Sequence, residues 1–277
     1  MATTTTPQAA PKKKGMTRRQ RAKYFRWIQY AVGILVLVVI AFLADWSAFA
    51  KAFLNIDVAL EMFPAVVTTG LKNTLIYTVL AFIFGFVLGV IIALMRLSSV
   101  RVYRVLGGAY VELFRGLPSL LVLFLVALGI PRAFPGFQFP GGFYGQVMVG
   151  LGLTAAAYMA ETIRAGIQAV PKGQVEAART LGFSPARTLR VIVLPQAFRI
   201  VIPPLTNEII LLVKDSSLVY VLGVTLSQYE LTKFSQSKVV EYASSTPLVV
   251  GGLLYLVITL PLSQLVRRLE IRHAKAR

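Results

Sequence analysis

Long apolar runs separated by short polar and charged segments dominate the chain. Four windows of 16 to 25 residues contain no charged side chain, and they are residues 27–44, 73–95, 116–131 and 242–266. A helix that crosses the hydrocarbon core of a bilayer needs about 20 mostly apolar residues. These windows therefore predict membrane-spanning helices.

Two further apolar segments carry interruptions. The charge-free window 133–160 begins with prolines and glycines, which move the expected helix start to about residue 143. The segment 205–224 is long enough to span a bilayer but contains three ionisable residues. Together the six segments predict an all-α, polytopic membrane protein with six transmembrane helices.

The expected organisation surrounds one transmembrane domain with shorter terminal parts. The parts are a basic disordered cytoplasmic N-terminus (1–26), an additional first transmembrane helix (27–46), an outer loop (47–65), the transmembrane domain (66–268) and a basic cytoplasmic tail (269–277). Within the domain the expected spans are about 68–95, 115–133, 143–165, 200–224 and 243–266, and a loop covers 170–196.

The distribution of positive charge predicts the orientation of these spans. With the N-terminus inside, 23 of the 29 Lys and Arg residues fall in cytoplasmic segments and only four in outer loops. Cytoplasmic loops retain an excess of Lys and Arg during insertion. We therefore expect both termini in the cytoplasm. The same asymmetry explains the net charge of +18 without nucleic-acid binding.

Composition excludes several kinds of chemistry. The chain has no cysteine, and its single histidine, His273, lies among basic residues near the end. Disulfides, thiolate metal sites and cysteine nucleophiles are therefore excluded. No Gly-Lys dipeptide occurs, so the chain lacks the core of a phosphate-binding loop. We expect no catalytic residues, no metal site and no cofactor.

Small residues at four-residue spacing predict close helix packing. Gly85 and Gly89 lie in the second span, and Gly152, Ala156 and Ala160 lie in the fourth. Such stripes let the backbones of membrane helices approach each other. Packing within one subunit is favoured over a seam between two subunits.

The loop at 170–196 is patterned as two short helices. Pro171 suits a helix start, and Gly182 supplies the left-handed residue that commonly ends a helix. Ser184 and Pro185 then form an N-cap and first-position pair. A DNA-binding helix-turn-helix is disfavoured, because spans at both ends would hold the second helix near the headgroups.

The same loop carries a specific resemblance. Glu176-Ala177-Ala178, followed by Gly182 and by Leu194-Pro195, resembles the EAA loop of membrane subunits of ATP-binding-cassette (ABC) importers. The surrounding sequence is similar to the polar amino-acid permease family. The matching segments are 110–118, 157–166, 194–199 and 214–218, and the likeness covers about residues 66–268.

The resemblance implies a type I ABC-importer transmembrane fold and a passive permease subunit for polar amino acids, with the glutamate/glutamine type as one candidate. The implied partners are two ABC ATPase subunits, which hydrolyse the ATP, a second permease subunit of the same or a related chain, and an external solute-binding protein. The implied location is the prokaryotic plasma (inner) membrane. The residues implied in ATPase coupling are Glu176, Ala177, Ala178, Arg179, Gly182, Arg187, Leu194 and Pro195.

Polar residues within the spans are candidates for the translocation path or substrate site, because ionisable groups in a bilayer usually face a bundle interior or an aqueous cavity. The candidates are Glu161, Glu208, Lys214, Asp215 and Ser216. A purely structural role stays open for some of these candidates. Lys214 and Asp215 could form a local, interior ion pair or an interhelical contact. Glu161 could instead pair with Arg164 on the helix surface.

A self-contained, ion-coupled carrier or channel is the alternative function. Secondary transporters tend to contain internal repeats with paired broken helices. Here only the fifth span is clearly interrupted by charge, with no counterpart in the other half of the chain. The importer subunit is therefore favoured over the carrier.

Overall fold

The computed structural model describes residues 18–275, and this part of the chain is helical without strands. The chain divides into two compact units between Ala50 and Lys51. The first unit contains α1 (Arg18–Leu43) and the start of α2 (Trp46–Phe53). None of the side chains of α1 is buried, and the helix is long and apolar enough to cross a membrane.

The beginning of α1 corrects one prediction. Residues 18–26, expected in a disordered tail, are helical, whereas residues 1–17 lie outside the described part. Arg, Gln, Ala and Lys favour helices, and no proline or glycine interrupts residues 18–26. The basic end of the first span is therefore a continuation of its helix.

The second unit is built around the contact of α4 with α8. The π-helix η1 (Val66–Leu71) leads into α4 (Lys72–Leu97), which packs along α8 (Phe143–Gln168). A Cβ added to Gly85 would lie 3.1 Å from the Cβ of Ala155, and one on Gly89 would lie 3.0 Å from the Cβ of Met159. These approaches confirm that the small-residue stripes pack within one subunit.

The straight part of the third expected span, 115–133, begins only at Ser119 and is therefore shorter than predicted. It consists of α6 (Ser119–Phe124), η2 (Leu125–Gly129) and α7 (Ile130–Ala133), and it follows α5 (Arg101–Gly116) at a bend of 107°. No span was predicted over most of α5, which lies between the expected spans 68–95 and 115–133, because its arginines break every charge-free window. The helix is instead amphipathic, with Gly107 and Val111 buried.

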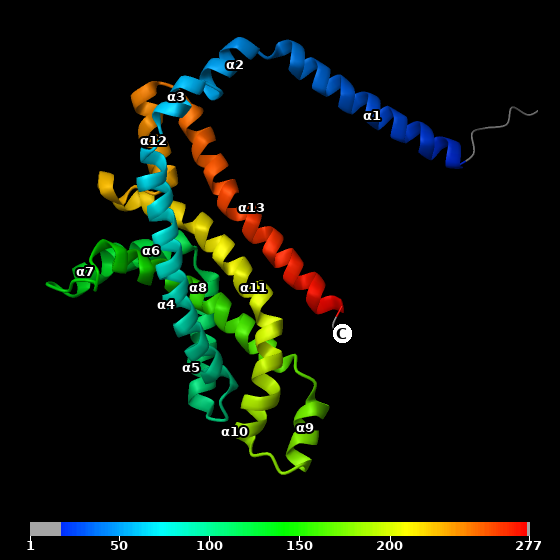
Figure 1. The fold of residues 1–277 in the computed structure, drawn as a ribbon, viewed down its shortest axis with the longest axis vertical. Coiled ribbons are helices and arrows are strands. Elements are labelled where there is room, and N and C mark those ends of the chain that lie inside the picture. The colour runs from blue at the N-terminus through cyan, green and yellow to red at the C-terminus, as the bar shows by residue number, and fades with distance from the viewer. Residues whose placement is uncertain (1–17, 276–277) are drawn as a thin grey trace, which may run out of the picture. The chain divides into compact units, whose positions relative to one another are not determined.

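The remaining helices lie toward two opposite ends of the second unit (Figure 1). One end, which we call the loop end, carries α9 (Lys172–Thr180) and α10 (Pro185–Thr188), followed by η3 (Leu189–Val193) and α11 (Leu194–Asp215). The other end, the distal end, carries α3 and α12. The bounds of these two helices and of the elements not yet given are α3 (Ile56–Glu61), η4 (Ser216–Leu222), η5 (Leu226–Gln228), α12 (Leu231–Tyr242) and α13 (Thr246–Lys275), and α13 runs from the distal end back toward the loop end.

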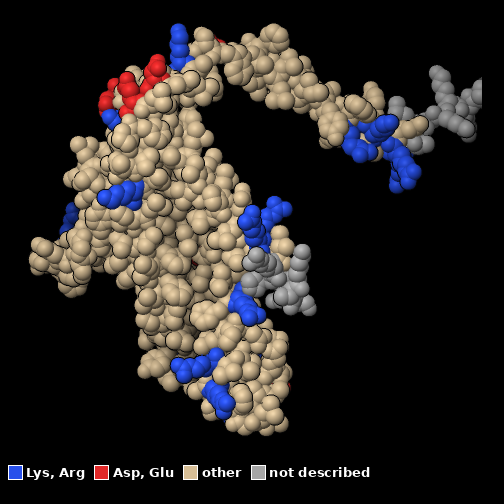
Figure 2. Space-filling view, in the orientation of Figure 1, with Lys and Arg blue, Asp and Glu red and all other residues tan. Residues whose placement is uncertain are grey.

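Charge differs between these ends on the visible face. Figure 2 shows acidic side chains gathered over α3 and α12, and basic side chains near α9 and α10. Within residues 18–275, five helices are long and apolar enough to span a membrane, and a sixth span is obtained if the bent pair of α5 with α6–α7 counts as one. The prediction of an all-α, six-span membrane fold is thereby confirmed.

Candidate functional site

The predicted helix pair between α8 and α11 is present. Pro171 immediately precedes α9, and Gly182 follows it with a φ of +81°. The amide of Phe183 donates to the carbonyl of Ala178 at 3.1 Å, a bond that closes a helix at a left-handed residue. The Ser184 hydroxyl accepts from the amide of Arg187 at 3.2 Å and caps α10.

This helix pair is fixed to both neighbouring spans. Val170, Val193 and Ala197 are buried together in a small apolar cluster, against which Val175 of α9 packs. The side-chain amide nitrogen of Gln196 on α11 donates to the side-chain oxygen of Gln174 on α9 at 2.6 Å. α9 is therefore held against the start of α11 by both apolar contacts and a hydrogen bond.

The residues of the EAA motif divide between two faces of α9. Ala178 is buried, with 5% of its surface exposed, and so it packs inward. Glu176, Ala177 and Arg179 are exposed, and the side chain of Leu181 is 79% exposed. Ala177 and Leu181 thus lie on the outer side of this segment together with Glu176 and Arg179.

The other predicted coupling residues lie on the following elements. A hollow of about 480 Å³ is lined by both Arg187 and Leu194. The guanidinium of Arg187 lies 4.4 Å from the centre of the Phe183 ring. Pro195 is exposed and is the second residue of α11, which continues directly from the π-helix η3.

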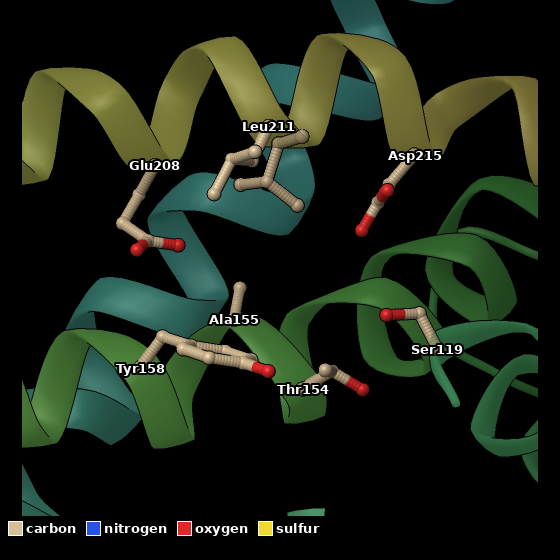
Figure 3. A pocket seen from close by; sticks show the side chains of 8 residues that line it. Ser119, Thr154, Ala155, Tyr158, Glu208, Leu211 and Asp215 are labelled. Carbon is tan, nitrogen blue, oxygen red and sulfur yellow. The ribbon is translucent and has the colours of Figure 1, made fainter. Parts of the chain in front are cut away.

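A cavity of about 210 Å³ lies between α6, α8 and α11 and opens to the surface of the chain, since Tyr158 and Leu211 of its lining are exposed (Figure 3). Glu208 and Asp215 project from α11 toward α8, seven residues apart on one helix face. The lining residues are Ser119, Thr154, Ala155, Tyr158, Glu208, Leu211, Leu212 and Asp215.

The polar groups of this cavity are incompletely paired. The Ser119 hydroxyl hydrogen-bonds to the carboxylate of Asp215. The Oγ1 atom of Thr154 is buried and has no hydrogen-bond partner in the part of the chain that the structure describes. The lining contains two carboxylates but no Lys, Arg or His, and no ion pair within residues 18–275 involves Glu208 or Asp215. Such a cavity is suited to a ligand that carries a positive group and hydrogen-bonding groups.

Three of the predicted path candidates lie outside the cavity. Glu161 forms ion pairs with both Arg96 and Arg164, which supports its structural alternative and extends it to α4. Lys214 is exposed, and among the described residues no ion pair connects it to Asp215.

Ser216 is the third of these candidates. It is fully buried, and its hydroxyl donates to the carbonyl of Val213 at 2.7 Å. Of the five candidates, the structure therefore brings only Glu208 and Asp215 together in the cavity.

Ser119, Thr154 and Tyr158 of the cavity were missed by sequence reasoning. They are uncharged residues on two other helices, and the sequence does not indicate which helices approach α11. The bend after Gly116, which places Ser119 at the cavity, is marked only by Pro118. Within residues 18–275 no group of three or more His, Cys, Asp or Glu side chains is arranged to hold a metal ion.

Comparisons with known proteins bear on both regions. A family model described as a binding-protein-dependent transport system inner membrane component matches residues 85–275. The chain is 40% identical to the probable glutamine ABC transporter permease protein GlnM of Bacillus subtilis (strain 168) over 223 residues, which are 80% of this chain and 100% of that protein. It is 36% identical to the arginine transport system permease protein ArtQ of the same organism, covering 73% of this chain and 89% of ArtQ.

A solved structure shares the fold. It is described as the crystal structure of an amino acid ABC transporter with histidines, and it superposes with a TM-score of 0.68 at 34% identity. The match covers 77% of this chain and 96% of that one.

Proposed function

Because the chain belongs to the family of binding-protein-dependent transport system inner membrane components, we propose that it forms the path of a polar amino acid through the membrane and is driven by ATPase subunits at α9. The chain is a permease subunit of an ABC importer for amino acids and a transport component, not an enzyme. Membership in this family favours the importer subunit over the alternative of a self-contained, ion-coupled carrier.

The observation that carries the coupling proposal is the exposed face of α9. Glu176, Ala177 and Leu181 face outward, while Ala178 and the Gln174–Gln196 bond fix the helix to the spans. A rigid, partly apolar knob fits the groove of a cytoplasmic ATPase better than a flexible tether does. We assign α9 and α10 to the cytoplasmic side, in agreement with the Lys/Arg asymmetry of the loops.

The remaining partners follow from the same proposal. The chain pairs with a second permease subunit, and the pair contacts two ATPase subunits. An external solute-binding protein delivers the substrate to the distal end. A substrate of the glutamine type is supported by the similarity to GlnM over that protein's full length. The complex lies in the prokaryotic plasma membrane, with both termini of this chain in the cytoplasm.

The cavity between α8 and α11 is the proposed passage for the substrate. Every amino acid carries an ammonium group, and Glu208 and Asp215 supply negative charge without a lining cation. Thr154 supplies a buried hydroxyl that has no hydrogen-bond partner among the described residues. These three groups are suited to hold the ammonium group and a polar side chain during passage.

A cysteine placed on α9 tests the coupling proposal, since the chain has no cysteine of its own. In the assembled complex, Leu181→Cys is expected to crosslink to an ATPase subunit and to react with an impermeant thiol reagent only in inside-out vesicles. Leu226→Cys is the control, because Leu226 is similarly exposed, at 75%, but lies after η4, beyond α11 from the loop end. Labelling of Leu181→Cys from outside the cell would refute the proposal.

A further inference from the structure

The chain between α11 and α12 folds back onto α4. After η4 the backbone turns at Gly223, which has a φ of +75°, and only the three-residue η5 precedes α12. We call residues 223–230 the return segment. Because so little of it is regular helix, its backbone carbonyl groups need partners from elsewhere when they are removed from water.

Two side chains of α4 bind three consecutive carbonyl groups of the return segment. The side-chain amide nitrogen of Asn73 donates to the backbone carbonyls of Ser227 at 2.8 Å and Tyr229 at 2.9 Å. The hydroxyl of Tyr77 donates to the carbonyl of Gln228 at 2.8 Å. Asn73 is 2% exposed and Tyr77 is fully buried, so water does not compete for these bonds.

Asn73 joins further elements at the same point. Its side-chain oxygen accepts from the hydroxyl of Tyr144 on α8 at 3.2 Å. One residue on, the hydroxyl oxygen of Thr74 accepts from the amide of Leu231 at 3.1 Å, at the start of α12. Both N–H groups and the oxygen of the Asn73 amide are therefore engaged, each with a different residue.

The last residue of the return segment is a buried carboxylate. Glu230 is fully buried and accepts from the amides of Thr232 at 2.6 Å and Lys233 at 2.7 Å, which caps α12. It also accepts from the hydroxyl of Tyr255 on α13 at 3.0 Å. Burial raises the pKa of Glu230, whereas these donors favour its ionised form. The segment is thus anchored at its end to α12 and α13, and along its length to α4.

The return segment lies beyond the cavity toward the distal end. Ala155 and Leu212 line the cavity and belong to the same buried apolar cluster as Tyr77. Along α8, Tyr144 precedes Ala155 by eleven residues, which is about 16 Å of helix. Along α8, Tyr77 and the return segment therefore lie between the distal end and the cavity.

We propose that the return segment is a gate that closes the distal end of the path, and that Asn73 and Tyr77 are the positioning residues that hold it closed. The inference rests on the proposed role of the cavity as the passage for substrate. Segments held by a few side-chain hydrogen bonds open at lower free energy than packed helices do. The α4–α8 seam, by contrast, is close-packed through its glycines and stays fixed while the segment moves.

Cysteine accessibility in the complete complex tests the gate. A Thr154→Cys reporter places the only cysteine of this chain in the cavity. An impermeant thiol reagent is added from the outside to right-side-out vesicles without ATP, and modification of this chain is measured by mass. Adding Tyr77→Phe removes only one hydroxyl group. We expect it to raise the modification rate about fivefold, the effect of one lost hydrogen bond on an opening equilibrium.

Tyr110→Phe is the matched control. The hydroxyl of Tyr110 on α5 donates to the carbonyl of Leu153 at 2.8 Å, the same bond length as that of Tyr77 to Gln228. We expect no change of the modification rate in Tyr110→Phe. Asn73→Leu, which removes three hydrogen bonds at similar volume, is expected to exceed Tyr77→Phe and to raise ATP hydrolysis without the binding protein.

The results separate the gate from the proposed function. Equal modification rates with and without Tyr77→Phe, or an equal rise in Tyr110→Phe, would overturn the gate. Protection of the reporter by added amino acid supports the cavity as passage independently of the gate. A reporter that neither the impermeant nor a permeant reagent modifies, with or without ATP, would contradict the passage itself and therefore both proposals.

Discussion

The α9–α10 pair and the cavity differ in how their residues are assembled. The helix pair is local, since its start, its left-handed end and its second cap lie within residues 171–185. The cavity combines α6, α8 and α11, whose lining residues extend from Ser119 to Asp215. The first is an exposed surface set by backbone conformation, and the second is a partly open cavity set by helix packing. Variants in the two regions should therefore fail at different steps.

Removal of both cavity carboxylates should have the largest effect. In Glu208→Gln with Asp215→Asn, we expect amino-acid uptake by the reconstituted complex to fall by about 100-fold or more, because a hydrogen bond to a charged group contributes about 1.5–3 kcal/mol. Association with the ATPase subunits should be unchanged. Glu112→Gln, an exposed carboxylate of α5, is the control. Normal uptake in the double variant would exclude the cavity as the passage.

The left-handed end of α9 should give the next largest effect. A Cβ on Gly182 meets no atom within 4 Å, so Gly182→Ala reports backbone conformation rather than a clash. The φ of +81° makes this change cost about 1–2 kcal/mol, and uptake and ATPase affinity should fall together by about tenfold.

Gly173→Ala is the matched control for this prediction. Gly173 lies within α9 and also has open space, but its backbone is helical. Alanine is favoured there by roughly 0.5–1 kcal/mol, so the helix should be stabilised and uptake retained. Similar losses in both variants would show that any side chain on α9 is harmful, contrary to the conformational explanation.

Truncation of the exposed apolar residue should weaken docking alone. In Leu181→Ala we expect the affinity for the ATPase subunit, measured in detergent, to fall about fivefold, because the contact area of one partly buried leucine is lost. The thermal midpoint of the chain alone should not change, since Leu181 is 79% exposed. A loss of stability without a loss of affinity would place Leu181 outside the interface.

The cap of α10 should give the smallest effect. Ser184→Ala removes the acceptor for the Arg187 amide, which destabilises a helix by about 1 kcal/mol. Hydrogen exchange should increase in residues 184–188, while the cavity residues remain as protected as before. Faster exchange around Thr154 in this variant would contradict the separation of the two regions.

The two regions also differ in what the sequence could predict. Pro171, Gly182 and Ser184 act on their immediate neighbours, and for this reason the bounds of α9 and the start of α10 were predicted correctly. The second helix does not end before the span, because α10, η3 and α11 follow one another without a break. The stripes at Gly85 and Gly152 likewise predicted the α4–α8 contact, because close packing in a membrane requires small residues.

The cavity was predictable only in part. Glu208 and Asp215 share a helix face by their spacing, but Ser119 and Thr154 depend on which helices surround α11. α5 was missed because its arginines conceal an amphipathic helix. Glu161 was ambiguous, since its partner Arg96 is distant in the sequence. For the cavity lining and for Glu161, the contacts that sequence reasoning missed join residues that are far apart in the chain.

Uptake by vesicles of defined composition shows whether this chain transports an amino acid only together with ATPase subunits and a binding protein. Vesicles containing this chain alone, and vesicles that also contain the ATPase subunits and the binding protein, are given ATP on the α9 side and amino acid on the other. The account predicts accumulation only in the complete system. Accumulation by the chain alone would contradict it.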